Sequence, residues 1–117
     1  MKIRYPVVIK YPDFELGLFK TEKIFFEESG CEEEDFSRSH DLIYDSEGKL
    51  LVYDSKARLL SVQNDKKRIS KEDVISHFKA HLEYFASEDA RKQFNQAAHN
   101  LSLQKVILIG VKITKGA

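Results

Sequence analysis

Apolar and polar residues alternate along the beginning of the chain, which is the pattern of a β-strand with one buried face. In residues 3–11, one face carries Ile3, Tyr5, Val7 and Ile9. Pro6 lies on the other face and cannot donate a backbone hydrogen bond, which favours either an edge position for this strand or an orientation in which no neighbouring strand needs that donor. Alternation resumes in residues 14–18, and two more apolar positions follow at Ile24 and Phe26. The pattern therefore predicts a meander of three strands.

A β-hairpin is predicted where two short apolar segments, residues 42–44 and 50–53, flank the turn Asp45-Ser46-Glu47-Gly48. A glycine near the end of such a turn adopts the positive φ that this kind of hairpin needs. Residues 57–62 are expected to extend the sheet through a second tight turn at residues 54–56.

Two amphipathic helices are predicted after residue 70, each opened by a serine that can cap the first turn, Ser70 and Ser87. The first helix has an apolar stripe made of Val74, Ile75, Phe78, Leu82 and Phe85. The second has a stripe of mostly smaller residues, made of Ala90, Phe94, Ala97, Ala98 and Leu101. The two stripes predict a helical pair packed on the sheet.

The last apolar segment, residues 106–113, is apolar on both faces from Val106 to Ile109 and alternates afterwards. Strands in the middle of a covered sheet have this pattern, so we expect a central strand here. Together these elements predict one α+β domain over residues 1–117. Its sheet is expected to be mainly antiparallel, with about six or seven strands and a helical pair packed on one face.

The composition agrees with one folded core, since 42% of the 117 residues are hydrophobic, including eight Phe and five Tyr. The longest aliphatic run is too short to cross a bilayer, and the beginning of the chain lacks the apolar stretch of a signal peptide. The lone cysteine, Cys31, cannot form an internal disulfide. We therefore expect a cytoplasmic protein that does not enter a membrane.

Charge is distributed unevenly along the chain, although nineteen basic and nineteen acidic residues cancel. Residues 22–47 contain ten acidic residues and two basic ones, Lys23 and Arg38, so this stretch carries about −8 and the rest about +8. Such asymmetry creates a local field that can steer a partner of opposite charge. Nucleic acid is disfavoured as a partner, because the compact basic run at residues 66–68 contains no aromatic residue.

Residues 27–40 are predicted to form a long surface loop, because they are polar apart from Phe36 and contain Gly30. We expect this loop to bind a basic protein through Glu27, Glu28, Glu32, Glu33, Glu34, Asp35 and Phe36, with the aromatic ring as an apolar anchor. The leading hypothesis is a non-enzymatic protein-binding module, such as an immunity or antitoxin-like protein. The alternative is that the charged run is only a solvated segment.

A second hypothesis is a small enzyme or ligand-binding domain that uses the first predicted helix. His77 and His81 stand four residues apart, a spacing at which two imidazoles can share a ligand, with Tyr84 beside them. No metal site is expected, because no third ligand accompanies the pair. A catalytic dyad of Cys31 and His40 is disfavoured, because the surrounding carboxylates oppose a thiolate. Phosphate-loop and dinucleotide motifs are missing, so no cofactor is expected and no catalytic residue is assigned.

Three features together resemble a bacterial family of small α+β domains of unknown function. They are Tyr5-Pro6-Val7-Val8-Ile9-Lys10, then Asp41-Leu42-Ile43-Tyr44-Asp45-Ser46-Glu47-Gly48, and then the serine-capped helix with His81. The resemblance covers roughly the first 85 residues. It implies an α+β fold and a bacterial cytoplasmic setting, and it implies no particular activity.

Overall fold

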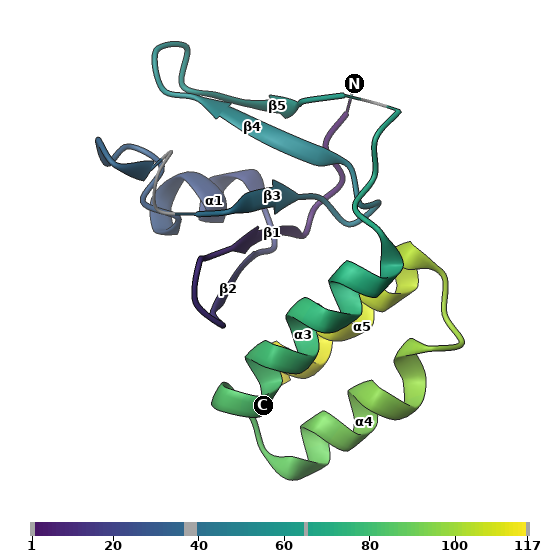
Figure 1. Cartoon of the computed structure of the whole chain (residues 1–117). Coiled ribbons are helices and arrows are strands. Elements are labelled where there is room, and N and C mark those ends of the chain that lie inside the picture. The colour runs from purple at the N-terminus through teal and green to yellow at the C-terminus, as the bar shows by residue number, and fades with distance from the viewer. Residues whose placement is uncertain (1, 37–39, 65, 117) are drawn as a thin grey trace.

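The computed structural model describes residues 2–36, 40–64 and 66–116. Five antiparallel strands form one sheet in the order β2-β1-β3-β4-β5 (Figure 1). The strands are β1 (Val7–Lys10), β2 (Leu16–Phe19), β3 (Leu42–Tyr44), β4 (Leu50–Asp54) and β5 (Leu59–Val62). The helices described are α1 (Glu22–Glu28), α3 (Lys71–Phe85), α4 (Glu88–Ala98) and α5 (Leu103–Gly116). The protein is therefore α+β with an antiparallel sheet, as the sequence predicts.

The sheet separates two hydrophobic clusters. On one face Val8 and Tyr44 pack with the apolar sides of α3, α4 and α5, which lie together in Figure 1. On the other face Val7 and Ile9 pack with Phe25 of α1. The predicted alternation of β1 is thus confirmed, because consecutive valines of this strand belong to opposite clusters.

The strand β1 occupies an inner position, so the second of the two arrangements expected for Pro6 is the one observed. It pairs with β2 on one side and with β3 on the other. Pro6 directly precedes the first strand residue, Val7, so its missing N–H interrupts no hydrogen bond of the ladder.

The hairpin of β3 and β4 is confirmed. Gly48 has a φ of +83° and its N–H donates to the Asp45 carbonyl at 3.0 Å. A Cβ at Gly48 would also lie 2.6 Å from Cδ2 of Leu103, so both the backbone and the packing require glycine here. The predicted extension by β5 is confirmed as well.

Both serine-capped helices are confirmed. Ser70 Oγ accepts a hydrogen bond from the Asp73 N–H at 3.1 Å, and Ser87 Oγ accepts one from the Ala90 N–H at 3.2 Å. The first predicted stripe is buried from Val74 to Leu82, whereas Phe85 at the end of α3 is exposed. Phe85 is therefore not part of the core.

The third strand predicted around Ile24 and Phe26 is wrong, because this segment is the helix α1. Thr21 caps it, and its Oγ1 accepts a hydrogen bond from the Ile24 N–H at 3.1 Å. Phe25 points into the core between two partly buried neighbours. Three consecutive apolar residues fit a short helix over a sheet as well as a strand, and the threonine cap decides between them.

The predicted central strand at residues 106–113 is also wrong, because it belongs to the helix α5. The buried residues Val106, Ile107, Gly110 and Val111 recur at helical spacing. A Cβ at Gly110 would lie 2.8 Å from the ring of Phe78, so glycine lets α5 approach α3 closely. In the described residues the sheet consequently has five strands rather than six or seven, and a third helix, α5, packs with α3 and α4. No helix in the described part of the chain is long and apolar enough to span a membrane.

Candidate functional site

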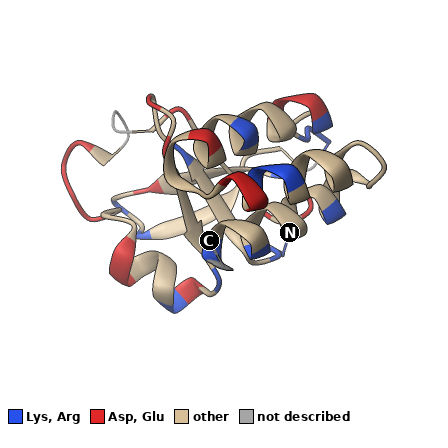
Figure 2. Cartoon of the chain, turned by 90° about the horizontal axis from the view of Figure 1, so that it is seen from below, with Lys and Arg blue, Asp and Glu red and all other residues tan. Residues whose placement is uncertain are grey.

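Six exposed carboxylates gather at the end of α1 and on the turn that follows it. We call them the acidic segment: Glu27, Glu28, Glu32, Glu33, Glu34 and Asp35. Figure 2 shows them as red stretches on α1 and on the neighbouring loop, at the left of the view. The structure thus brings the predicted carboxylates together on the surface.

Two buried side chains hold the acidic segment on the sheet. Cys31 and Phe36 are 1% and 4% exposed, and both belong to the cluster around Phe25. The Phe36 ring lies 5.6 Å from the ring of Tyr53, centroid to centroid. Backbone hydrogen bonds from Glu33 to Gly30 and from Phe36 to Glu33 close the turn between them, at 3.0 and 3.1 Å. The described part of residues 27–40 is therefore a helix end and an anchored turn, not a long loop.

This geometry corrects the role predicted for Phe36. A ring that is almost fully buried in the core is not presented to a partner as an apolar anchor. Phe36 instead fixes the turn that carries the carboxylates. Residues 37–39, which include Arg38, one of the two basic residues counted in the charged stretch, lie outside the described residues.

The acidic segment keeps most of its charge unpaired. Lys23 Nζ lies 4.0 Å from Glu27, in an exposed helical pair. Within the described residues, no Lys or Arg lies within 4.0 Å of the carboxylates at positions 32–35. The other acids of the charged stretch are placed differently, because Asp41 pairs with Lys10 at 3.5 Å and Asp45 is buried. The negative field of residues 22–47 is therefore concentrated on this segment.

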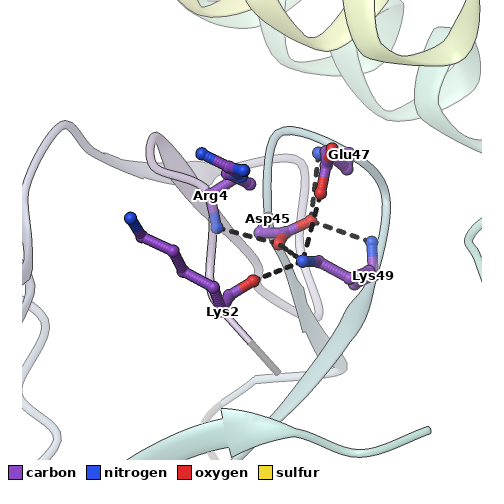
Figure 3. Close-up of polar contacts among 5 residues, drawn as sticks. All are labelled: Lys2, Arg4, Asp45, Glu47 and Lys49. Carbon is purple, nitrogen blue, oxygen red and sulfur yellow. Dashed lines mark hydrogen bonds and ion pairs between the residues drawn. The ribbon is translucent and has the colours of Figure 1, made fainter. Parts of the chain in front are cut away.

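Asp45 and Lys49 form a buried polar cluster at the β3–β4 turn (Figure 3). Lys49 Nζ lies 3.3 Å from Asp45 Oδ2 and 3.1 Å from Glu47 Oε1, and it donates to the Lys2 carbonyl. Asp45 Oδ2 also accepts the Arg4 N–H at 3.0 Å. The hydrogen bond from Lys49 is the main cause that lowers the pKa of the Glu47 carboxyl. Because these contacts join the first residues to the turn, the cluster is structural.

The predicted helix-edge residues lie on α3 but contact different elements. His81 is buried, and its Nδ1 accepts the Leu16 N–H from β2 at 3.0 Å. His77 lies beside Tyr44 of β3, with 6.2 Å between ring centroids. Burial lowers the pKa of both imidazoles. Since His81 Nδ1 can accept this bond only when the ring is uncharged, its first role is to hold β2 on α3.

Tyr84 belongs to an exposed aromatic patch that sequence patterns do not predict. Its ring stacks on Phe14 with 4.3 Å between centroids and 13° between planes. The neighbouring Phe85 stacks on His81 at 4.8 Å. Phe14, Tyr84 and Phe85, which we call the aromatic patch, are 48%, 62% and 58% exposed. The only sequence signal was that Phe85 sits beside Tyr84 at the end of an amphipathic helix, so that the two cannot both face the core.

The last candidates from the sequence are Cys31 and His40, which both pack near Phe36. The Cys31 thiol is buried, and the His40 ring packs on Phe36 with 4.5 Å between centroids, while His40 Nδ1 lies 2.7 Å from the Phe36 carbonyl oxygen. In residues 2–36, 40–64 and 66–116, no three His, Cys, Asp or Glu side chains come together as a metal site would require.

Comparisons with protein-family models, with curated proteins and with solved structures found no match for this chain. The resemblance to a bacterial family of small α+β domains therefore stays an expectation from the sequence.

Proposed function

We propose that this chain is a non-enzymatic protein-binding module whose acidic segment binds a basic surface of a partner protein. The observation that carries the proposal is the combination of exposed carboxylates with a buried anchor on the same turn. Glu32, Glu33, Glu34 and Asp35 are exposed between the core residues Cys31 and Phe36. An anchored turn restricts the positions of the four carboxylates, so less conformational freedom is lost when a partner binds.

Exposed carboxylates of this kind act mainly on the rate of association. Their field extends over about 8 Å at physiological ionic strength and attracts a surface of opposite charge. Unpaired carboxylates are also available for ion pairs with Arg or Lys across an interface. The acidic segment therefore suits a partner with a basic surface.

An immunity or antitoxin-like role in a bacterial cytoplasm agrees with this chemistry, because a basic toxin would supply such a surface. The alternative, an enzyme or ligand-binding domain at His77, His81 and Tyr84, has less support. His81 Nδ1 is engaged by the backbone of β2, and Tyr84 is stacked on Phe14.

Affinity capture with two forms of the protein tests the proposal. One form is the wild type and the other carries Glu32→Gln, Glu33→Gln, Glu34→Gln and Asp35→Asn, which remove charge while preserving shape. We expect a basic protein to be captured by the wild type and lost with the variant. Its association rate with the wild type should fall steeply as salt rises, and the variant should associate slowly with little salt dependence.

A matched control removes the same number of charges elsewhere, through Glu72→Gln, Glu83→Gln, Glu88→Gln and Asp89→Asn on α3 and α4. This control should retain the partner and its association rate. If the acidic-segment variant associates at the wild-type rate at low salt, or if both variants lose binding equally, the acidic segment is not the binding surface.

A further inference from the structure

Three of the large apolar side chains that the protein exposes are the aromatic patch, Phe14, Tyr84 and Phe85. They come from two elements that are far apart in the sequence, the β1–β2 turn and the last turn of α3. Exposed aromatic rings that gather in this way mark interaction sites, because each ring can bury a large area with little loss of conformational freedom.

Each exposed ring is backed by another ring. Phe14 and Tyr84 lie nearly parallel at 4.3 Å, so each covers one face of the other. Phe85 is backed by His81, whose Nδ1 is fixed by the Leu16 N–H. Because the rings support each other on one side, their outer faces are held in place for a ligand.

Two carboxylates lie on the same turn as Phe14. Asp13 and Glu15 flank Phe14 in the sequence and are exposed. Asp13 Oδ1 accepts the Glu15 N–H at 2.8 Å, which orients that carboxylate in the turn. His81 Nδ1 also lies 3.3 Å from the Phe14 carbonyl oxygen, so the turn that carries both carboxylates touches the ring that backs Phe85. A surface of aromatic faces and carboxylates complements a cation, above all the planar guanidinium group.

Lys10, whose side chain contacts this turn, is already engaged. Lys10 Nζ donates to the carbonyls of Tyr11 and Asp13 and lies 3.5 Å from Asp41. Because the Lys10 ammonium is bound to these partners, Glu15 and the outer faces of the aromatic patch can bind a cation of another molecule.

The patch and the acidic segment belong to the same end of the sheet. Lys10 at the end of β1 is paired with Leu42 at the start of β3, and the Lys10 carbonyl accepts the Asp41 N–H at 2.7 Å. The end of β1 that leads into the β1–β2 turn therefore lies beside residues 41 and 42, at the start of β3.

We propose that the aromatic patch binds an arginine side chain of the basic partner, which stacks on Tyr84 while Asp13 or Glu15 pairs with its guanidinium group. This inference rests on the proposed function, since it supplies the close contact that Phe36, being buried, does not provide. The acidic segment attracts the partner, and the patch holds one of its arginines.

Nuclear magnetic resonance of the ¹⁵N-labelled protein tests the inference with N-acetyl-arginine amide as the probe. We expect weak, saturable shifts of the backbone signals at residues 13–16 and 81–85. The uncharged isostere N-acetyl-citrulline amide should cause little change at the same concentration. Tyr84→Leu, which keeps an apolar side chain but removes the ring, should weaken arginine binding about 2- to 5-fold, the range of an exposed cation–π contact.

Leu59→Ser is the matched control, because Leu59 is similarly exposed on the edge strand β5. This variant should bind the probe as the wild type does. Equal shifts with citrulline, an unchanged affinity in Tyr84→Leu, or no shifts at the patch would each overturn the inference. If the shifts are confined to residues 27–35, the patch assignment fails while the proposed function of the acidic segment keeps its support. If they are confined to the patch and the neutralised acidic segment still associates at the wild-type rate, the proposed function fails and the patch stands.

Discussion

Replacing Asp45 should destabilise the protein strongly, because this buried carboxylate joins the N-terminal segment to the β3–β4 turn. It accepts hydrogen bonds from the backbone N–H groups of Arg4, Glu47 and Lys49, besides its ion pair with the Lys49 ammonium. Asp45→Ala removes this acceptor from all of them at once. Breaking a buried pair by removing one partner costs about 3–5 kcal/mol, and every buried donor left unpaired adds to the loss. We therefore expect a loss near the upper end of that range, about 5 kcal/mol.

Lys49→Met should cost less, about 3 kcal/mol, because it leaves Asp45 with its three backbone donors and keeps an apolar side chain of similar length. Glu47→Gln should have the smallest effect of the three, since the Glu47 side chain is partly exposed and makes only the outer ion pair. The expected order of destabilisation is thus Asp45→Ala, then Lys49→Met, then Glu47→Gln.

Urea unfolding followed by circular dichroism measures these differences as changes in the free energy of unfolding. The slope with urea should be similar in the three variants, so that the midpoints can be compared directly. A loss below about 1 kcal/mol for Asp45→Ala, which is the size expected for an exposed ion pair, would refute the reasoning. A reversed order of Asp45→Ala and Lys49→Met would show that the ammonium, and not the backbone hydrogen bonds, holds the cluster together.

Three further predictions concern the packing of α3. Stability should fall as the pH drops below about 6.5, because burial lowers the pKa of His81 in the folded protein. The unfolded chain then binds a proton that the folded chain does not, which favours unfolding. Urea midpoints measured between about pH 8 and pH 5 check this. Leu82→Ala should cost about 2–5 kcal/mol, whereas Phe85→Ala should change stability by less than about 0.5 kcal/mol, as urea unfolding will show. Gly110→Ala should lower the melting temperature, because its Cβ would meet the Phe78 ring at 2.8 Å.

The elements that the sequence predicts correctly have their causes close by in the chain. The β3–β4 hairpin follows from a glycine at the end of a four-residue turn, and the two capped helices follow from a serine before each apolar stripe. Local chemistry of this kind acts wherever the segment lies in the fold, so no knowledge of its neighbours is needed.

The helix α5 could not be predicted in this way. The four aliphatic residues from Val106 to Ile109 favour a strand when taken alone, because they include β-branched side chains on both faces. Tertiary packing favours the helix instead. Val106, Ile107 and Val111 pack against the other helices, and Gly110 lies close to the ring of Phe78. Contacts between distant segments override local preference here.

The candidate site likewise has features that local sequence determines and features that tertiary packing determines. Exposure of the carboxylates at positions 32–35 follows from their charge, so the sequence predicts it. The burial of Phe36 does not follow, because a single aromatic residue among polar neighbours can face either the core or a partner. The stack of Phe14 on Tyr84 could not be predicted from the sequence either, since it depends on how the β1–β2 turn packs against the end of α3.

The burial of Phe36 also changes how a partner would be held. With Phe36 at the surface, attraction and close contact would come from the same short segment, and mutations there would alter both association and dissociation. Under the two proposals made above, attraction comes from the acidic segment and close contact from the aromatic patch. Charges act before contact, whereas stacked rings act only after it. Neutralising residues 32–35 should therefore slow association, and Tyr84→Leu should speed dissociation while the association rate stays close to that of the wild type.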